Sequence, residues 1–83
     1  MRLVNIGYGN MIAAARVLAV VSAESAPARR MVQDAREDKR LIDATAGHRA
    51  ASVAVLDNGF VALSPLQAET VAARLTTEHE GEG

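Results

Sequence analysis

Few side chains in this 83-residue chain are placed for catalysis. His48 follows Asp43 by five residues, and a histidine and an aspartate can together transfer a proton. The local sequence supplies no serine or threonine that would complete a catalytic triad, and it has no nucleophile-elbow motif. We therefore predict that the chain is not an enzyme. His48 is expected either to face solvent in a loop or to contact a phosphate or a base.

A glycine-containing segment follows the first short apolar stretch. Gly7-Tyr8-Gly9 faintly resembles a dinucleotide-binding fingerprint, but Ile12 stands where the third glycine is needed, and the next segment is not clearly helical. Glycine adopts positive φ angles at little cost. We therefore interpret Gly7, Gly9 and Asn10 as structural residues of a tight turn.

The sequence offers no ligand set for a metal and no cofactor motif. It contains no cysteine, which excludes disulfides, zinc fingers and thiol chemistry. Outside the last residues, His, Asp and Glu do not recur at ligand spacing. No apolar run approaches the ~18–20 residues of a membrane-spanning helix, and no signal peptide is recognised. We expect no cofactor, no metal, no membrane contact and a cytoplasmic location.

Arginine supplies most of the positive charge. The formal net charge is −1, but the last eight residues hold three glutamates and no basic residue, so residues 1–75 carry nine basic and seven acidic side chains. Eight of the nine basic residues are arginine, whose planar fork suits phosphate. Arg16 and Arg49 each precede a predicted strand. These arginines are either solvated surface residues or phosphate contacts.

The pattern of apolar and turn residues predicts the elements that position these side chains. They form an α/β (α+β) domain with about five strands and two helices. Strands are expected at 2–6, 17–21, 41–45, 52–56 and 60–63, and helices at 27–39 and 65–76. The continuous apolar run at 17–21 predicts a strand covered on both faces. Asn58-Gly59 predicts a type I′ hairpin turn, and Ser64–Gln67 matches a capping box.

The apolar content overstates the core, since 17 of the 41 apolar residues are alanine. A chain this short needs extra support when it has no disulfide or metal. The predicted strands expose more apolar surface than two short helices can cover. We therefore expect neighbouring copies of the chain to cover part of it.

The sequence resembles the RemA family of bacterial extracellular-matrix regulators from Leu3 to Leu75. The matching segments are Val4–Met11, Ala15-Arg16, Ser25–Pro27, Gln33–Arg36, Asp43–Thr45 with Gly47, and Glu69–Ala72 with Arg74-Leu75. The resemblance implies a RemA-like domain at 1–75 with a LytTR-like subunit. It also implies a ring-like homo-oligomer that binds double-stranded DNA and regulates transcription of biofilm matrix genes. Residues 76–83 are expected to be an acidic disordered tail.

The resemblance also assigns roles to individual residues. Arg16 matches a family arginine needed for function, Pro27 a structural proline, and Arg49 an arginine of the basic loop. Family members often have a run resembling Gly-Arg-Arg-Thr-Arg in this loop, where His48 and Ala51 here replace two arginines. We predict DNA contacts by Arg16, Arg49 and His48. The alternative is a non-DNA oligomeric scaffold or protein-interaction module, and salt-dependent DNA binding distinguishes the two.

Overall fold

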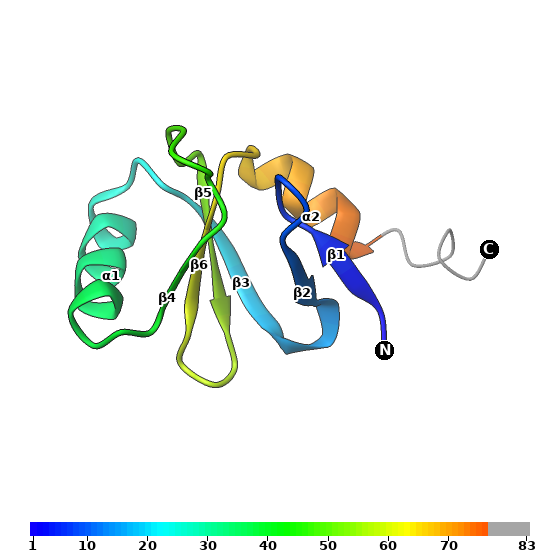
Figure 1. Cartoon of the computed structure of the whole chain (residues 1–83), viewed down its shortest axis with the longest axis horizontal. Helices are drawn as coiled ribbons and strands as arrows, with labels where there is room; N and C mark the ends of the chain where they lie inside the picture. Colours follow the sequence, from blue (N-terminus) through cyan, green and yellow to red (C-terminus); the bar gives the residue numbers. More distant parts are fainter. Residues whose placement is uncertain (77–83) are drawn as a thin grey trace.

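The computed structural model describes residues 1–76, which fold into a small α+β domain (Figure 1). The elements are, in order, β1 Leu3–Asn5, β2 Met11–Ala13, the 3-10 helix η1 Ala14–Arg16, β3 Val17–Ser22, α1 Ala26–Glu37, β4 Leu41–Asp43, β5 Ser52–Leu56, β6 Val61–Ser64 and α2 Ala68–Thr76. The predicted fold class, the two helices and the hairpin are confirmed, with six strands in place of about five. Of the expected tail, residues 77–83 lie outside the described part.

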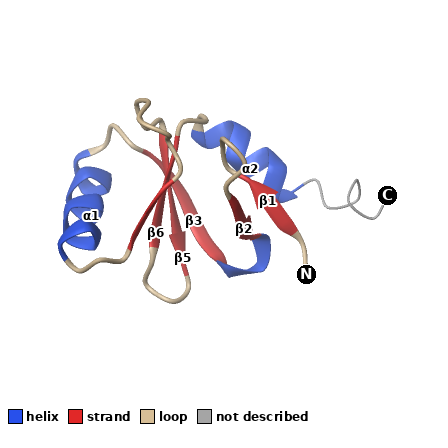
Figure 2. Ribbon diagram, viewed as in Figure 1, coloured by secondary structure: helices blue, strands red, loops and turns tan. Residues whose placement is uncertain are grey.

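The strands form two sheets. The larger sheet has the order β3-β5-β6-β4, with β4 parallel to β6 and the other pairs antiparallel. Strands β1 and β2 pair as a separate antiparallel ribbon. Figure 2 shows the resulting layers, with α1 on one side of the larger sheet and the ribbon with α2 on the other. Each face of the larger sheet therefore packs against other elements of the chain, but the edge strand β3 stays partly exposed.

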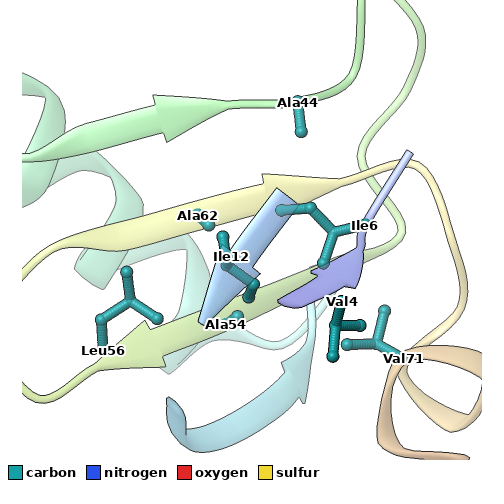
Figure 3. Close-up of a cluster of buried hydrophobic side chains, with 8 residues drawn as sticks. All are labelled: Val4, Ile6, Ile12, Ala44, Ala54, Leu56, Ala62 and Val71. Atoms are coloured by element: carbon teal, nitrogen blue, oxygen red, sulfur yellow. The ribbon is translucent and has the colours of Figure 1, made fainter. Parts of the chain in front are cut away.

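The core is divided between these two faces. Successive side chains of a strand point to opposite faces, and the strands of the hairpin follow this rule. Val53, Val61 and Leu63 pack on the α1 side. Ala54, Leu56 and Ala62 pack against the ribbon and α2, where they meet a cluster that also contains Val4, Ile6, Ile12, Ala44 and Val71 (Figure 3).

The prediction that 17–21 is a strand covered on both faces is wrong for the single chain. Strand β3 lies at the edge of the sheet, and each of its residues is exposed or half-buried. Its pairing with β5 is interrupted between Val17 and Ala19, so Leu18 has no opposite residue and is 70% exposed. A bulge of this kind removes one residue from the regular alternation. The apolar run therefore contains an exposed leucine near its start.

Helix α1 begins one residue earlier than predicted and has a serine cap. The Ser25 hydroxyl accepts the backbone N–H of Ala28 at 3.2 Å. Pro27 lies in the first turn, where its missing N–H costs nothing. Ala28 and Ala35 are buried against the sheet, as the helical spacing predicts, and Met31 and Val32 are half-buried beside them.

The hairpin is present, but its turn is not type I′. The Leu56 N–H donates to the Phe60 carbonyl at 2.9 Å, and the Gly59 N–H donates to the Leu56 carbonyl at 3.2 Å. Gly59 has a φ of 91°, whereas Asn58 is not in the positive-φ region. The loop therefore has three residues and ends in a left-handed glycine, the next most common solution after the two-residue turn.

Helix α2 begins at Ala68, three residues later than predicted, because Ser64 is not its cap. Ser64 is the last residue of β6 and is buried. Its hydroxyl donates to the Ile6 carbonyl at 2.6 Å and accepts the Leu66 N–H at 3.0 Å. The Gln67 carbonyl accepts the Val71 N–H instead. Ser64 thus joins the larger sheet to the segment that follows β1.

Candidate nucleic-acid interface

The turn between β1 and β2 is held by its own backbone and amide side chains. Gly7 donates its N–H to Asn5 Oδ1 at 2.8 Å, and Asn10 Nδ2 donates to the Gly7 carbonyl at 2.8 Å. The Ile6 N–H donates to the Asn10 carbonyl at 2.8 Å, which closes the turn. Tyr8 takes a φ of 51° at the tip, and its side chain is 60% exposed. The turn therefore presents an aromatic ring to solvent.

The loop between β4 and β5 carries the predicted basic residues on a fixed base. Asp43 Oδ1 accepts the Thr45 hydroxyl at 2.6 Å and the Thr45 N–H at 2.9 Å. The chain then turns through positive φ angles at Ala46 and Gly47. The His48 N–H donates to the Thr45 carbonyl at 2.9 Å. This turn leaves the His48 side chain exposed next to Arg49.

These bonds also set the ionisation of Asp43. Thr45 lowers the pKa of the Asp43 carboxyl below its usual value, first through its hydroxyl and then through its N–H, with a smaller contribution from the positive charge of Arg36. Partial burial acts in the opposite direction but is outweighed. Hydrogen bonds to the charged form of a carboxylate favour that form. Asp43 is therefore an ionised anchor of the loop at neutral pH.

Replacing Asp43 with alanine is expected to lower the free energy of unfolding by about 1 kcal/mol at pH 7, because two donors of Thr45 lose their acceptor. The depressed pKa means that ionised Asp43 stabilises the fold above the unfolded pKa of about 4, and that this contribution disappears as pH falls through the folded pKa. The loss of unfolding free energy caused by Asp43→Ala should therefore be smaller at about pH 3 than at pH 7. Urea unfolding of the parent and the variant at the two pH values measures this loss, and an equal loss at both would contradict this role of Asp43.

The two turns meet through their aromatic side chains. The rings of Tyr8 and His48 stack with centroids 5.2 Å apart and planes only 7° from parallel. The stack fixes the direction of the His48 ring at the tip of the β4–β5 loop. Tyr8 is not among the residues predicted for the site. The signal for it in the sequence is an aromatic residue between two glycines, in a chain with one tyrosine and one phenylalanine.

The side chain of Arg49 is more exposed than that of Arg16. The Arg49 side chain is 85% exposed, and its nearest acidic partner is Glu24, with 3.7 Å between Arg49 Nη2 and Glu24 Oε2. An ion pair this exposed contributes little to stability. The guanidinium is therefore available to another anion.

Arg16 directly precedes strand β3, at the end of this strand that is far from the β4–β5 loop. Its Nη1 is 3.1 Å from Asp57 Oδ2, and its carbonyl accepts the Asp57 N–H at 2.8 Å. Val17 pairs with Leu56, whereas Ser22, at the far end of β3, pairs with Ser52 near the basic loop. Six residues of strand correspond to about 20 Å. One chain therefore brings His48 and Arg49 together but holds Arg16 apart from them.

Three other arginines hold the fold together. Arg2 donates to the carbonyls of Arg74 and Leu75, and Arg74 donates to the Asn5 carbonyl at 2.7 Å, which joins the β1–β2 ribbon to the end of α2. Arg40 donates to the Gly59 carbonyl and pairs with Asp38 at 3.2 Å. These three side chains therefore bond to other parts of the domain. By contrast, Arg29 and Arg30 on α1 make no hydrogen bond or ion pair within residues 1–76.

Comparison with known proteins places this arrangement in a family. Residues 3–75 match the RemA-like family, described as extracellular matrix regulatory protein A-like. The chain belongs to the RemA-like family. A protein of Bacillus cereus strain AH187, named "Putative regulatory protein", is 54% identical over 80 residues, which cover 96% of this chain and 92% of that protein. A protein of the same name from Bacillus mycoides strain KBAB4 is 52% identical with the same coverage.

The RemA-like family and the names of these relatives indicate a bacterial regulatory protein rather than an enzyme. Within residues 1–76, His, Asp and Glu side chains form no group of three that could hold a metal ion. No helix of this described part has the length and apolar character needed to cross a membrane. The candidate site of the RemA-like domain is the β4–β5 loop, where the Arg49 and His48 side chains are exposed.

Proposed function

We propose that this RemA-like chain is a DNA-binding transcriptional regulator of bacterial extracellular-matrix genes. In this proposal it acts in the cytoplasm as a ring-like homo-oligomer and contacts double-stranded DNA through Arg49, His48 and Arg16. The observation that carries the proposal is the tip of the β4–β5 loop, where Arg49 and His48 project from a base fixed by the hydrogen bonds of Asp43 and Thr45.

The chemistry of this tip suits the DNA backbone. A guanidinium donates two parallel hydrogen bonds to a phosphate, and such charge-assisted bonds are about twice as strong as neutral ones. Within residues 1–76, the one ion pair of Arg49 is the exposed pair with Glu24, which a phosphate can replace. The His48 ring, stacked on Tyr8, is held in place beside it and has nitrogen atoms that can donate to a second phosphate oxygen.

Arg16 can contribute to the same duplex in spite of its distance from the loop. The roughly 20 Å of strand between the two ends corresponds to about six base-pair steps of 3.4 Å. Each further copy in a ring would add its own Arg16 and Arg49, and linked contacts reinforce one another through effective concentration. A homo-oligomer therefore compensates for the small number of cations that one chain presents.

The exposed apolar side chains favour self-association. Leu3 and Met11 lie on the outer face of the β1–β2 ribbon, and Leu18 lies on β3, whose outer edge pairs with no other strand of residues 1–76. An edge strand can also pair with another chain. Light scattering after size exclusion is expected to give a mass several times 8.7 kDa at micromolar concentration. A monomer at that concentration would remove both the ring and the reinforcement of contacts from the account.

The exposed apolar residues fit the alternative function too, since an oligomeric scaffold without DNA would also need them. A mobility-shift titration of duplex promoter fragments at two salt concentrations separates the two functions. A DNA regulator shifts the fragment at low salt and less at high salt, because phosphate contacts release bound counterions. An oligomer that shifts no fragment at either salt concentration would instead be the scaffold.

A further inference from the structure

A groove between α1 and the β4–β5 loop is lined by both arginine and apolar side chains. Its volume is about 310 Å³, and it includes Arg29 and Arg36 from α1 together with Arg49 from the loop. Val32 and Leu63 provide apolar surface in the same groove. This volume is at the lower end of the range of small-molecule sites, which combine an apolar lining with a few polar groups. We call it the α1 groove.

The positive charge of the α1 groove exceeds its negative charge in the described part of the chain. Of residues 1–76, three guanidinium groups and one carboxylate line it, and this carboxylate, Glu24, already lies beside Arg49 at 3.7 Å. Arg29 makes no hydrogen bond or ion pair within residues 1–76. Arg36 has a longer-range attraction to Asp43, whose pKa it helps to lower, and forms no ion pair with it in this part of the chain. The groove therefore has net positive charge and free donors.

The helix spaces these donors along one side. Arg29 and Arg36 are seven residues apart, which is close to two helical turns and about 10 Å along the axis. Gln33 lies one turn from Arg29 and also lines the groove. The flexible arginine side chains can reach toward one point from both ends of this span, and Arg49 approaches from the loop. Planar guanidinium groups match the oxygens of a phosphate in pairs.

We propose that the α1 groove binds a small phosphorylated molecule of the nucleotide class, with Arg29, Arg36 and Arg49 on its phosphates and Val32 and Leu63 against its less polar part. Binding at this groove does not depend on binding of DNA. Arg49 belongs to both surfaces, however, so a bound nucleotide would occupy one of the arginines that we assign to DNA. The nucleotide and the duplex would then compete.

Calorimetric titration of the full chain with ADP at low salt tests this proposal. Arg29→Gln and Arg36→Gln are each expected to weaken ADP binding at least about tenfold, because each removes charged hydrogen bonds to phosphate. Arg30→Gln is the matched control, since Arg30 is exposed on the same helix and outside the groove lining. It should change the affinity by less than about twofold, because distant charges are screened. Glu24→Gln should tighten binding, and adenosine, which lacks phosphate, should not bind.

Three results would overturn the proposal. Equal weakening by all three arginine variants would mean general attraction of anions to the helix, and equal binding of adenosine would mean that phosphate is not recognised. Loss of duplex affinity in Arg29→Gln and Arg36→Gln without any ADP binding would assign the groove to the phosphodiesters of DNA. By contrast, arginine-dependent ADP binding by a chain that binds no DNA would support the groove and contradict only the proposed function.

Discussion

Replacing Arg49 with glutamine is expected to weaken binding to duplex DNA by about 10–100-fold at ~0.1 M salt. The estimate follows from the loss of a charge-assisted contact worth about 1.5–3 kcal/mol, in which tenfold corresponds to about 1.4 kcal/mol. The Arg49 side chain is 85% exposed and that of its partner Glu24 is 72% exposed, so the substitution should leave the fold and the oligomer mass unchanged. Fluorescence anisotropy with a labelled duplex measures the affinity.

Two further variants make this result specific to the loop. Arg30→Gln removes the same charge from an exposed position on α1 and should change DNA affinity much less. His48→Arg adds a permanent cation at the tip and should tighten binding. If Arg30→Gln weakens binding as much as Arg49→Gln, the attraction belongs to the overall charge and the loop has no special part in it.

Replacing Gly7 with alanine is expected to destabilise the domain by about 3 kcal/mol or more. Gly7 is buried with a φ of 130°, which side chains rarely adopt, and an added Cβ would lie 2.8 Å from both Cδ and Cγ of Pro65. Backbone strain of this kind costs about 1–3 kcal/mol, and overpacking costs a similar amount again. Urea unfolding at one fixed protein concentration measures the loss, because oligomer stability depends on concentration.

Gly9→Ala provides the comparison for the same turn. Gly9 also has a positive φ, 79°, but a Cβ there would meet nothing within 4 Å. The expected cost is about 1–2 kcal/mol from the left-handed conformation alone. Equal losses for the two variants would mean that the close approach of Pro65 to Gly7 does not constrain this turn.

The sequence predicts local structure well where one residue type determines it. Pro27 and the spacing of Ala28 and Ala35 predict α1, and the alternation around Val53 predicts the two faces of the hairpin. The prediction that Ser64 caps α2 is wrong, because a serine before a proline fits a helix cap but also fits the end of a strand. Only the long-range bond to the Ile6 carbonyl, 58 residues away, shows that its hydroxyl serves the sheet.

The sequence predicts which residues belong to the candidate site, but it does not predict how they are arranged in space. The sequence indicates that Arg16 and Arg49 precede strands, yet it does not show that they lie at opposite ends of β3, because that depends on the pairing with β5. The stack of Tyr8 on His48 joins residues 40 positions apart in two separate loops, so no local pattern predicts it. The same is true of the α1 groove, where a helix and a distant loop supply the arginines.

The dependence of DNA affinity on salt, compared between the parent chain and an Arg16→Gln/Arg49→Gln double variant, tests the proposed function most directly. The logarithm of the binding constant falls linearly with the logarithm of salt concentration, with a slope of about −0.9 for each phosphate contact. We predict a steep slope for the parent and a slope shallower by about 1.8 for each subunit that touches the duplex through both arginines. A stable oligomer that binds no duplex at low salt, or equal slopes for the two chains, would contradict the account.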